Sequence, residues 1–257
     1  CGKERSCMSE LLKGNAASVT GSSRGIGKAI ALAFAEHGAD LVIHGTNQTA
    51  LEALREEIRG MGARCEYVAG DIGEYDTARR LAETCLSAYG RIDTLVNNAG
   101  INSRYRFEDL PLEEWDRMLR TNLTSAFYTC KCVVPHMLEQ KSGCIINMSS
   151  SAGKTAHPNA SICYGVSKAG INSLTQKLAY DLAPSGIRVN AVCPGPIETD
   201  MSQQWTPEYR EKVYSAIPLR RLGTGEDVAN VAVFLASEMS AFIVGESINV
   251  NGGKYMN

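Results

Sequence analysis

Two residues in this chain have side chains and a spacing that suit proton transfer at a reacting oxygen. Tyr164 and Lys168 are four positions apart in a segment with helical periodicity, so both side chains leave one face of the helix. A free tyrosine, with a pKa near 10, is a poor acid or base at neutral pH. An ammonium about 4 Å away, at an effective dielectric constant of about 20, contributes roughly 4 kcal/mol, or about 3 pKa units, as an upper figure. We therefore expect Lys168 to bring the pKa of Tyr164 near neutrality.

Hydroxyl groups at the end of an expected strand give this pair a chemical context, which a Tyr/Lys pair on a surface helix lacks. Ser149, Ser150 and Ser151 close an apolar run, and open α/β sheets bind ligands at the carboxyl edges of their strands. A carbonyl that accepts hydride develops negative charge on oxygen, so it needs a proton donor and a second hydrogen-bond donor. We expect Tyr164 to donate the proton and Ser150 to bond the same oxygen.

A glycine-rich turn near the start of the chain has the form of a dinucleotide site. The first expected strand runs into Thr20-Gly21-Ser22-Ser23-Arg24-Gly25-Ile26-Gly27, and a segment of helical period follows at once. Its GxxxGxG spacing is one residue off GxGxxG, and a helix N-terminus offers free amides and a positive dipole to phosphate. Gly21 is expected to permit the sharp turn, Gly25 the approach of a pyrophosphate, and Gly27 close packing of helix on strand. The expected cofactor contacts here are Gly21, Ser23, Arg24, Gly25, Ile26 and Gly27.

The choice between NADP and NAD is predicted from the end of the second expected strand. A protein strict for NAD usually has an acidic side chain there for the ribose 2′-hydroxyl, but this chain has His44-Gly45-Thr46-Asn47. Arg24 can meet a 2′-phosphate with its planar guanidinium, and Thr46 lies where a second basic residue is usual. We therefore expect NADP, with NAD as the alternative.

Two later strand ends complete the expected cofactor site. Asp71 and Ile72 follow the third expected strand and can hold the adenine edge. The fourth ends in Asn97-Asn98-Ala99-Gly100, which alone would be a turn signal. In this order after a phosphate-binding turn, we expect Asn98, Ala99 and Gly100 to form the floor of the cofactor site.

Short apolar runs alternate with helical segments from residue 16 onward, which indicates an α/β fold of the Rossmann type, with a doubly wound, parallel, seven-stranded sheet and helices on both faces. Strands are expected at 16–20, 40–44, 64–69, 94–97, 143–148, 188–192 and 247–250. Helices are expected at 26–37, 48–60, 75–89, 112–138, 161–183 and 226–237. Prolines interrupt the segment 195–217, which we expect to form a lid with a short helix. We expect one catalytic domain over 10–257, and an extension at 1–9 that is disordered or was added in cloning.

Composition narrows the class of partner. The formal net charge of −2 offers no footprint for nucleic acid or an anionic membrane, and no apolar stretch approaches the roughly 20 residues of a membrane span. Nine cysteines without a repeating spacing suggest reduced thiols and a cytoplasmic protein. The four histidines lack a metal spacing, so we expect no metal and place them at the surface or in loops.

In their order along the chain, these motifs resemble the short-chain dehydrogenase/reductase family. The resemblance spans nearly the whole chain and also rests on Thr121-Asn122-Leu123 and Pro194-Gly195. The tail, including residues 194–201, 217–223, 234–237 and 250–253, is most similar to the 3-oxoacyl-[acyl-carrier-protein] reductases of fatty acid biosynthesis. The resemblance implies an NAD(P)-dependent oxidoreductase that acts on a ketone or secondary alcohol, and a homotetramer paired through its two long helices.

The resemblance also implies further roles for individual residues. Lys168 would bond the nicotinamide ribose, and Asn122 would hold a water that connects Lys168 to solvent. Contacts to the nicotinamide side of the cofactor are implied for Pro194, Gly195, Ile197 and Thr199. Ser150 precedes Tyr164 by 14 positions where 13 is usual, so Ser151 stays an alternative.

Other functions remain open at this stage. Ser151-Ala152-Gly153-Lys154 matches the SxxK of serine acyl-enzymes, but the partner motifs SDN and KTG are absent from the sequence. A non-catalytic nucleotide-binding regulator would keep the fold without the chemistry. A dehydrogenase of a sugar, polyol, steroid or other small alcohol would share every motif. An acyl carrier protein is a weaker partner, because the positions where carrier-dependent reductases place two basic residues beside the active-site mouth hold Lys141 and Ser185.

Overall fold

The strands form a single parallel sheet, as the alternating pattern predicts. The computed structural model describes residues 10–157, 160–198 and 205–256. Within this part of the chain, the strand order is β3-β2-β1-β4-β5-β6-β7. The strands are β1 (Ala16–Val19), β2 (Asp40–Gly45), β3 (Cys65–Ala69), β4 (Thr94–Asn97), β5 (Gly143–Met148), β6 (Ile187–Pro194) and β7 (Ser247–Val250). The order reverses direction at β1, which places a crevice between the ends of β1 and β4.

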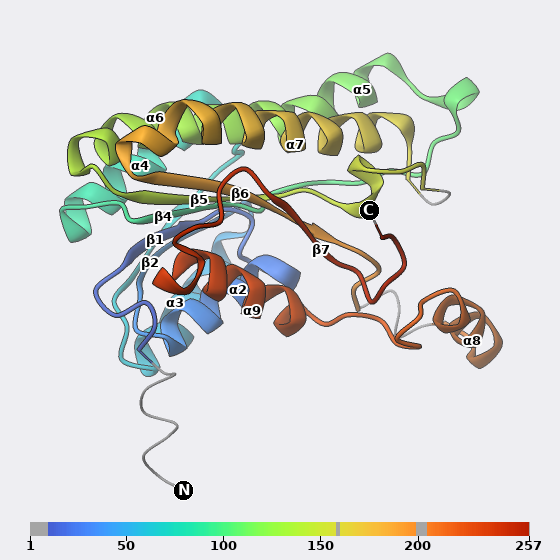
Figure 1. The fold of residues 1–257 in the computed structure, drawn as a ribbon, viewed down its shortest axis with the longest axis horizontal. Coiled ribbons are helices and arrows are strands. Elements are labelled where there is room, and N and C mark those ends of the chain that lie inside the picture. Colours follow the sequence, from blue (N-terminus) through green and yellow to red (C-terminus); the bar gives the residue numbers. More distant parts are fainter. Residues whose placement is uncertain (1–9, 158–159, 199–204, 257) are drawn as a thin grey trace, which may run out of the picture.

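Helices cover both faces of this sheet (Figure 1). One face carries α2 (Gly25–Glu36), α3 (Gln48–Gly60) and α9 (Gly225–Ala236), and the other carries α4 (Tyr75–Tyr89), α6 (Ser125–Gln140) and α7 (Ile162–Leu182). Central strand residues such as Leu41, Val42 and Ile43 are fully buried, because helices pack on both sides of them. The α/β fold with seven parallel strands is therefore confirmed.

Local signals set several helix ends. The Asn47 side chain accepts from the backbone N–H of Ala50 at the start of α3, and Thr224 and Asp227 form a reciprocal capping box at the start of α9. Gly90 ends α4 in the left-handed region. Short 3₁₀ turns lie at Phe107–Asp109, Ser151–Gly153, Ala183–Ser185 and Glu238–Ser240.

The expected helix at 112–138 is wrong in one respect. The structure has α5 (Leu112–Leu119), a π-helical turn (Arg120–Thr124) and then α6. Within the wider turn, the backbone N–H of Ser125 donates to the carbonyl of Arg120. A residue is thereby added to one turn, which changes the direction in which the side chain at Asn122 points.

The segment expected to be a lid contains α8 (Pro207–Ser215), which stands away from the sheet on the same side as α5 in Figure 1. Pro207 is at its first turn, and the Thr206 hydroxyl accepts from the backbone N–H of Tyr209. The short helix is confirmed, and its action as a lid stays a prediction. No helix within the described ranges has the length and apolar character needed to cross a bilayer. Residues 1–9 lie outside the described residues.

Candidate active site

The predicted reacting groups meet where β5 ends against the first turns of α7. Ser150 caps the 3₁₀ turn Ser151–Gly153, and its oxygen accepts from the backbone N–H of Ala152 at 3.1 Å. Burial raises the pKa of Tyr164, and the hydrogen-bonding Ser150 hydroxyl beside it opposes that rise. Ser151 is buried in the same turn. The structure thus brings Ser150 and Tyr164 together, and the choice between the two serines as catalytic residues stays a prediction.

Lys168 lies behind this pair, in the core. Its ammonium donates to the Met148 carbonyl at 2.7 Å, and the side chain is almost fully buried. Burial lowers the pKa of Lys168 from 10.5 to about 8. The ammonium lies 5.9 Å from the centroid of the Tyr164 ring. The expectation that Lys168 brings the pKa of Tyr164 near neutrality is therefore wrong for the protein alone, because burial dominates at the phenol.

Buried amides hold α7 against the sheet beneath the site. Asn97 donates to Asn147 at 2.9 Å, and Asn147 donates to the hydroxyl of Thr175 on α7 at 2.9 Å. The Thr129 hydroxyl of α6 completes the network by donating to Asn97. These bonds link β4, β5, α6 and α7, so they fix the helix that carries Tyr164 relative to the strand that ends at Ser150.

Asn122 is buried in the π-helical turn and points toward the loop after β4. Its amide oxygen accepts from the backbone N–H of Ile101 at 2.8 Å, and its nitrogen donates to the Ile101 carbonyl at 2.9 Å. The same nitrogen lies 3.1 Å from the hydroxyl of Ser167 on α7. Asn122 therefore joins the β4 loop to the Tyr164 helix, and the water that family resemblance implies there stays a prediction.

The glycine turn follows β1 closely, with close contacts at two of its glycines. A Cβ on Gly21, whose φ is +64°, would lie 2.7 Å from the Cα of Ala99. A Cβ on Gly27 would lie 2.3 Å from the Gly21 carbonyl and 2.4 Å from the Asn98 amide nitrogen. Gly25 has a φ of +57° and open space beside it. Gly27 therefore packs closely against the Gly21 carbonyl of the turn and against the Asn98 side chain. Gly25 has open space beside it, where a ligand has room to approach.

Sequence reasoning missed two polar residues that hold this turn. His44, expected at the surface or in a loop, is buried on β2. Its Nδ1 accepts from the backbone N–H of Gly21 at 3.3 Å, which leaves Nε2 to donate to the Gly70 carbonyl at 3.1 Å. Burial lowers the pKa of His44 to about 4. Ser22 accepts from the backbone N–H of His44 at 3.0 Å, so a neutral imidazole and this hydroxyl fix the turn to β2.

The other expected cofactor residues lie along the carboxyl edge of the strands. Asn98 donates to the carbonyls of Thr20 and Gly21, so it clamps the turn to β4. Arg24 and Thr46 are exposed after β1 and β2. Asp71 is exposed after β3 and accepts from the backbone N–H of Gly73 at 2.9 Å, while Ile72 is buried. Ser23 lies beside Gly45 at the end of β2, and Thr199 lies outside the described residues.

Two cavities meet at the reacting groups. A smaller one, of about 360 Å³, is lined by several of the expected cofactor residues, namely Ile26, Asn98, Gly100, Lys168, Pro194, Gly195 and Ile197. A larger one, of about 630 Å³, is lined by Ala152, Trp205, Tyr209 and Val213 among others. Asn102, Ser150, Tyr164 and Gly195 line both. A group in the smaller cavity can therefore react with one in the larger beside the Tyr164 phenol.

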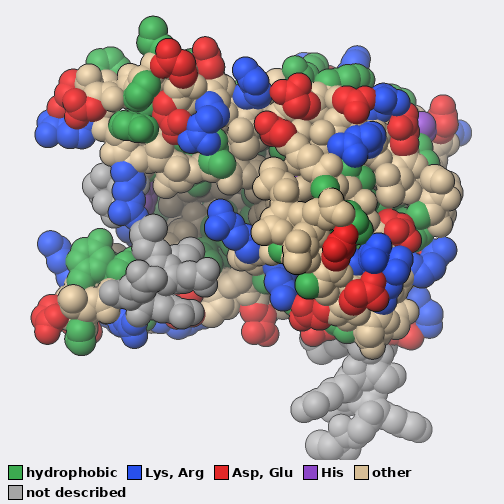
Figure 2. All heavy atoms as spheres, turned by 180° about the vertical axis from the view of Figure 1, so that it is seen from behind, with side chains coloured by type: hydrophobic (Ala, Val, Ile, Leu, Met, Phe, Trp, Pro, Cys, Tyr) green, Lys and Arg blue, Asp and Glu red, His purple; other side chains and the backbone are tan. Residues whose placement is uncertain are grey.

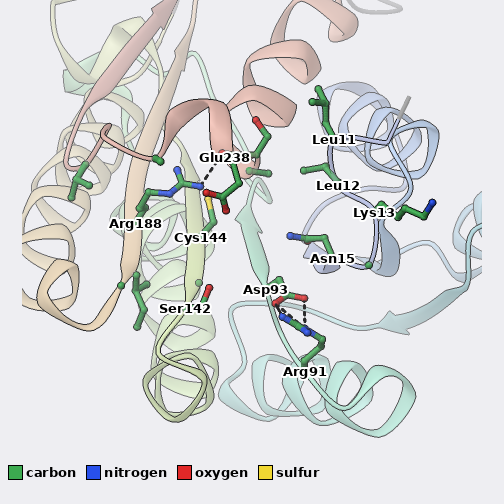
Figure 3. Close-up of a pocket in the computed structure, with 18 of the residues that line it drawn as sticks. Leu11, Leu12, Lys13, Asn15, Arg91, Asp93, Ser142, Cys144, Arg188 and Glu238 are labelled. Carbon is green, nitrogen blue, oxygen red and sulfur yellow. Dashed lines mark hydrogen bonds and ion pairs between the residues drawn. The ribbon is translucent and has the colours of Figure 1, made fainter. Parts of the chain in front are cut away.

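A further hollow, of about 680 Å³, lies at the opposite edge of the sheet, near the starts of β1, β4, β5 and β6 (Figure 3). Its charged groups are largely engaged within the fold. Arg91 pairs with Asp93 at 2.6 Å (Figure 3). Arg188 donates to the Leu235 carbonyl at 2.8 Å. This hollow contains none of the predicted reacting groups, so the carboxyl edge is the candidate active site.

Comparisons with known proteins agree with this geometry. Residues 21–254 match the profile of the family described as enoyl-(acyl carrier protein) reductase. The chain is 40% identical over 240 residues to the 3-oxoacyl-[acyl-carrier-protein] reductase FabG of Staphylococcus aureus, covering 93% of this chain and 97% of that protein. It is 38% identical over 242 residues to the FabG of Thermotoga maritima, covering 94% and 98%.

This chain belongs to the short-chain dehydrogenase/reductase family. A solved 3-oxoacyl-[acyl-carrier protein] reductase from Brucella melitensis with bound NAD superposes with a TM-score of 0.89 at 36% identity, covering 98% of this chain and 96% of that one. The recognition made from the motifs is confirmed, and the chain is a nicotinamide-dependent oxidoreductase of this family.

Proposed function

We propose that this family member reduces the carbonyl of a 3-oxoacyl thioester with NADPH. The observation that carries the proposal is the meeting of two cavities at Ser150 and Tyr164. Both residues carry a hydroxyl that can donate to one oxygen, which suits a carbonyl becoming an alkoxide. The choice of a 3-oxoacyl thioester as substrate comes from the names of the relatives at 40% and 38% identity, which are 3-oxoacyl-[acyl-carrier-protein] reductases.

Each residue has a distinct task in this mechanism. The nicotinamide would occupy the smaller cavity and supply the hydride. Ser150 bonds the substrate oxygen, and Tyr164 gives it a proton. Lys168 holds a buried positive charge behind the phenol, where it favours the tyrosinate left after proton transfer. Asn122 positions the helix that carries Tyr164 and Lys168 through its contact with Ser167.

NADP is the proposed cofactor because no carboxylate follows β2 and Arg24 is exposed beside the open space at Gly25. The Brucella structure with bound NAD keeps NAD as the alternative. Titrating both dinucleotides by fluorescence tests the preference. The Arg24→Ala substitution is expected to weaken the binding of NADP more than the binding of NAD.

A free thioester is a better first substrate than a carrier-linked one. Lys141 adjoins Gly186 near the starts of β5 and β6, at the edge opposite Tyr164, so it is not beside the site mouth of its own chain.

We keep the homotetramer as part of the proposal, since Phe127 of α6 and Ile162, Val166 and Tyr180 of α7 are exposed apolar residues. Sedimentation as a monomer at micromolar concentration would contradict it. The free thiols of the described cysteines suit the proposed cytoplasmic location.

The experiment is a substrate panel with NADPH and NADH. Acetoacetyl thioesters are compared with the oxidised forms of small sugars, polyols and steroids. We expect the thioesters to be reduced with NADPH and to have the highest kcat/KM of all compounds in the panel. Reduction of another class of compound without any thioester turnover would replace the proposed substrate. Enzymes that act on such compounds share every motif of this site.

A further inference from the structure

The larger cavity has an unbalanced charge. Basic side chains reach its lining from separate segments: Arg104 after β4, His157 after the 3₁₀ turn, Lys212 on α8, and Lys254 near the end of the chain. None of its described lining residues is an aspartate or a glutamate. In Figure 2 the molecule is hollowed between the part that carries α5 and the part that carries α8, and Lys and Arg side chains stand at the mouth of this hollow.

Ion pairs neutralise some of the described lysines and leave others, including the two of this cavity, without a carboxylate partner. Lys13, Lys28 and Lys177 each pair with a carboxylate on a neighbouring segment or turn. Within residues 10–157, 160–198 and 205–256, neither Lys212 nor Lys254 forms an ion pair. Their charge is therefore available to a ligand in the cavity.

His157 and Lys254 lie close enough to influence each other. The half-buried His157 has a lowered pKa, first because of burial and second because of the charge on Lys254. A lowered pKa keeps His157 uncharged at neutral pH, and an anion bound beside Lys254 would favour the protonated imidazole. The cavity is thus arranged for a negative group at some distance from the hydroxyls that hold the carbonyl oxygen.

We propose that the substrate carries an oxyanion, a carboxylate or a phosphate, which Lys212 and Lys254 hold on the wall of the larger cavity while its carbonyl lies against Ser150 and Tyr164. This inference rests on the proposed function, because it takes the Tyr164 end as the place of reduction. It adds that neutral sugars, polyols and steroids are poor substrates. The apolar wall formed by Trp205, Tyr209 and Val213 would contact the uncharged part of the molecule.

The test uses pairs of oxo compounds that differ only in charge. Acetoacetyl-4′-phosphopantetheine is compared with acetoacetyl-pantetheine, and 5-oxohexanoate with its methyl ester. Binding to the enzyme with NADP is measured by calorimetry, and reduction by loss of NADPH absorbance. We expect the anionic member of at least one pair to bind on the order of tenfold more tightly at low salt, and the ratio to approach 1 in 1 M NaCl. The pair that shows the preference distinguishes phosphate from carboxylate.

Variants assign the effect to the two lysines. The double variant Lys212→Gln/Lys254→Gln is expected to reduce the binding ratio below about 2, with single variants in between. Lys13→Gln/Lys131→Gln removes the same charge from outside the cavity and is expected to keep the ratio. Equal binding of charged and neutral members in both pairs would overturn the inference, as would an equal effect of the two double variants. Preferential binding of an anion without reduction of any thioester would support the inference and overturn the proposed function.

Discussion

Replacing Lys168 with methionine is expected to stabilise the fold while it abolishes catalysis. Methionine has a similar length and no charge, so it fits the same buried position. The pKa of Lys168 is lowered from 10.5 to about 8, and one pH unit corresponds to about 1.4 kcal/mol, so the charged form costs the folded protein about 3 kcal/mol. Loss of the 2.7 Å hydrogen bond to the Met148 carbonyl offsets about 1.5 kcal/mol of this. The net gain at pH 7 is about 1 to 2 kcal/mol.

The pH dependence separates this electrostatic effect from simple repacking. Below about pH 8 Lys168 is protonated in both states, so the whole cost of burying the charge is present. Between about pH 8 and 10.5 the unfolded chain binds the proton and the folded protein does not, so the cost falls as pH rises. The advantage of Lys168→Met should therefore be near zero by about pH 9.5.

The assay is urea unfolding of both proteins at pH 6, 7.5 and 9.5, at one protomer concentration, since assembly contributes to apparent stability. NADPH oxidation with an acetoacetyl thioester supplies the activity readout. A variant that is less stable than the parent at pH 6 and 7.5, by an amount independent of pH, would refute the reasoning.

Other predictions concern the serines, the glycine turn and the buried histidine. Ser150→Ala should lower kcat by about 10²- to 10³-fold and Ser151→Ala by only a few-fold, and a larger loss for Ser151→Ala in steady-state assays would reassign the catalytic serine. Gly27→Ala should weaken NADP binding at least tenfold in a fluorescence titration, because its Cβ would meet the Gly21 carbonyl at 2.3 Å, whereas Gly60→Ala, with open space, should not. His44 has a pKa lowered to about 4, so stability should fall as pH drops from 6.5 toward 4, and His44→Gln should flatten this part of the pH curve in thermal melts. An unchanged acid dependence in that variant would remove His44 as its cause.

The sheet was predictable because its signals are local. Buried runs such as residues 40–45 and 143–148 are bounded by turns, and the glycine turn follows the first strand without a gap. Asn122 shows where local signals fail. The apolar period continues through 112–138, but the helix is interrupted at the π-helical turn, where Asn122 contacts Ile101 and Ser167, which are distant in sequence. A helical period does not contain that information.

The electrostatics of the site could not be predicted from spacing. The four-residue separation of Tyr164 and Lys168 gives a shared helix face, but the burial of the Lys168 ammonium and the partial burial of Tyr164 depend on the strands and helices packed around them. His44 was missed for a related reason, since its ring bonds backbone groups of Gly21 and Gly70, and backbone partners leave no trace in residue types. Tyr164 and Lys168 on one side, and His44 and its backbone partners on the other, obtain their surroundings only when the chain folds.

The central claim is that Tyr164 gives a proton to a carbonyl oxygen as hydride arrives. Its most direct test is single-turnover oxidation of NADPH by an acetoacetyl thioester in Tyr164→Phe and the parent enzyme, with NADPH affinity measured alongside. We predict a rate lowered by about 10²- to 10⁴-fold, with a dissociation constant for NADPH changed less than about threefold. A Tyr164→Phe variant that keeps more than about a tenth of the parent rate would contradict the claim.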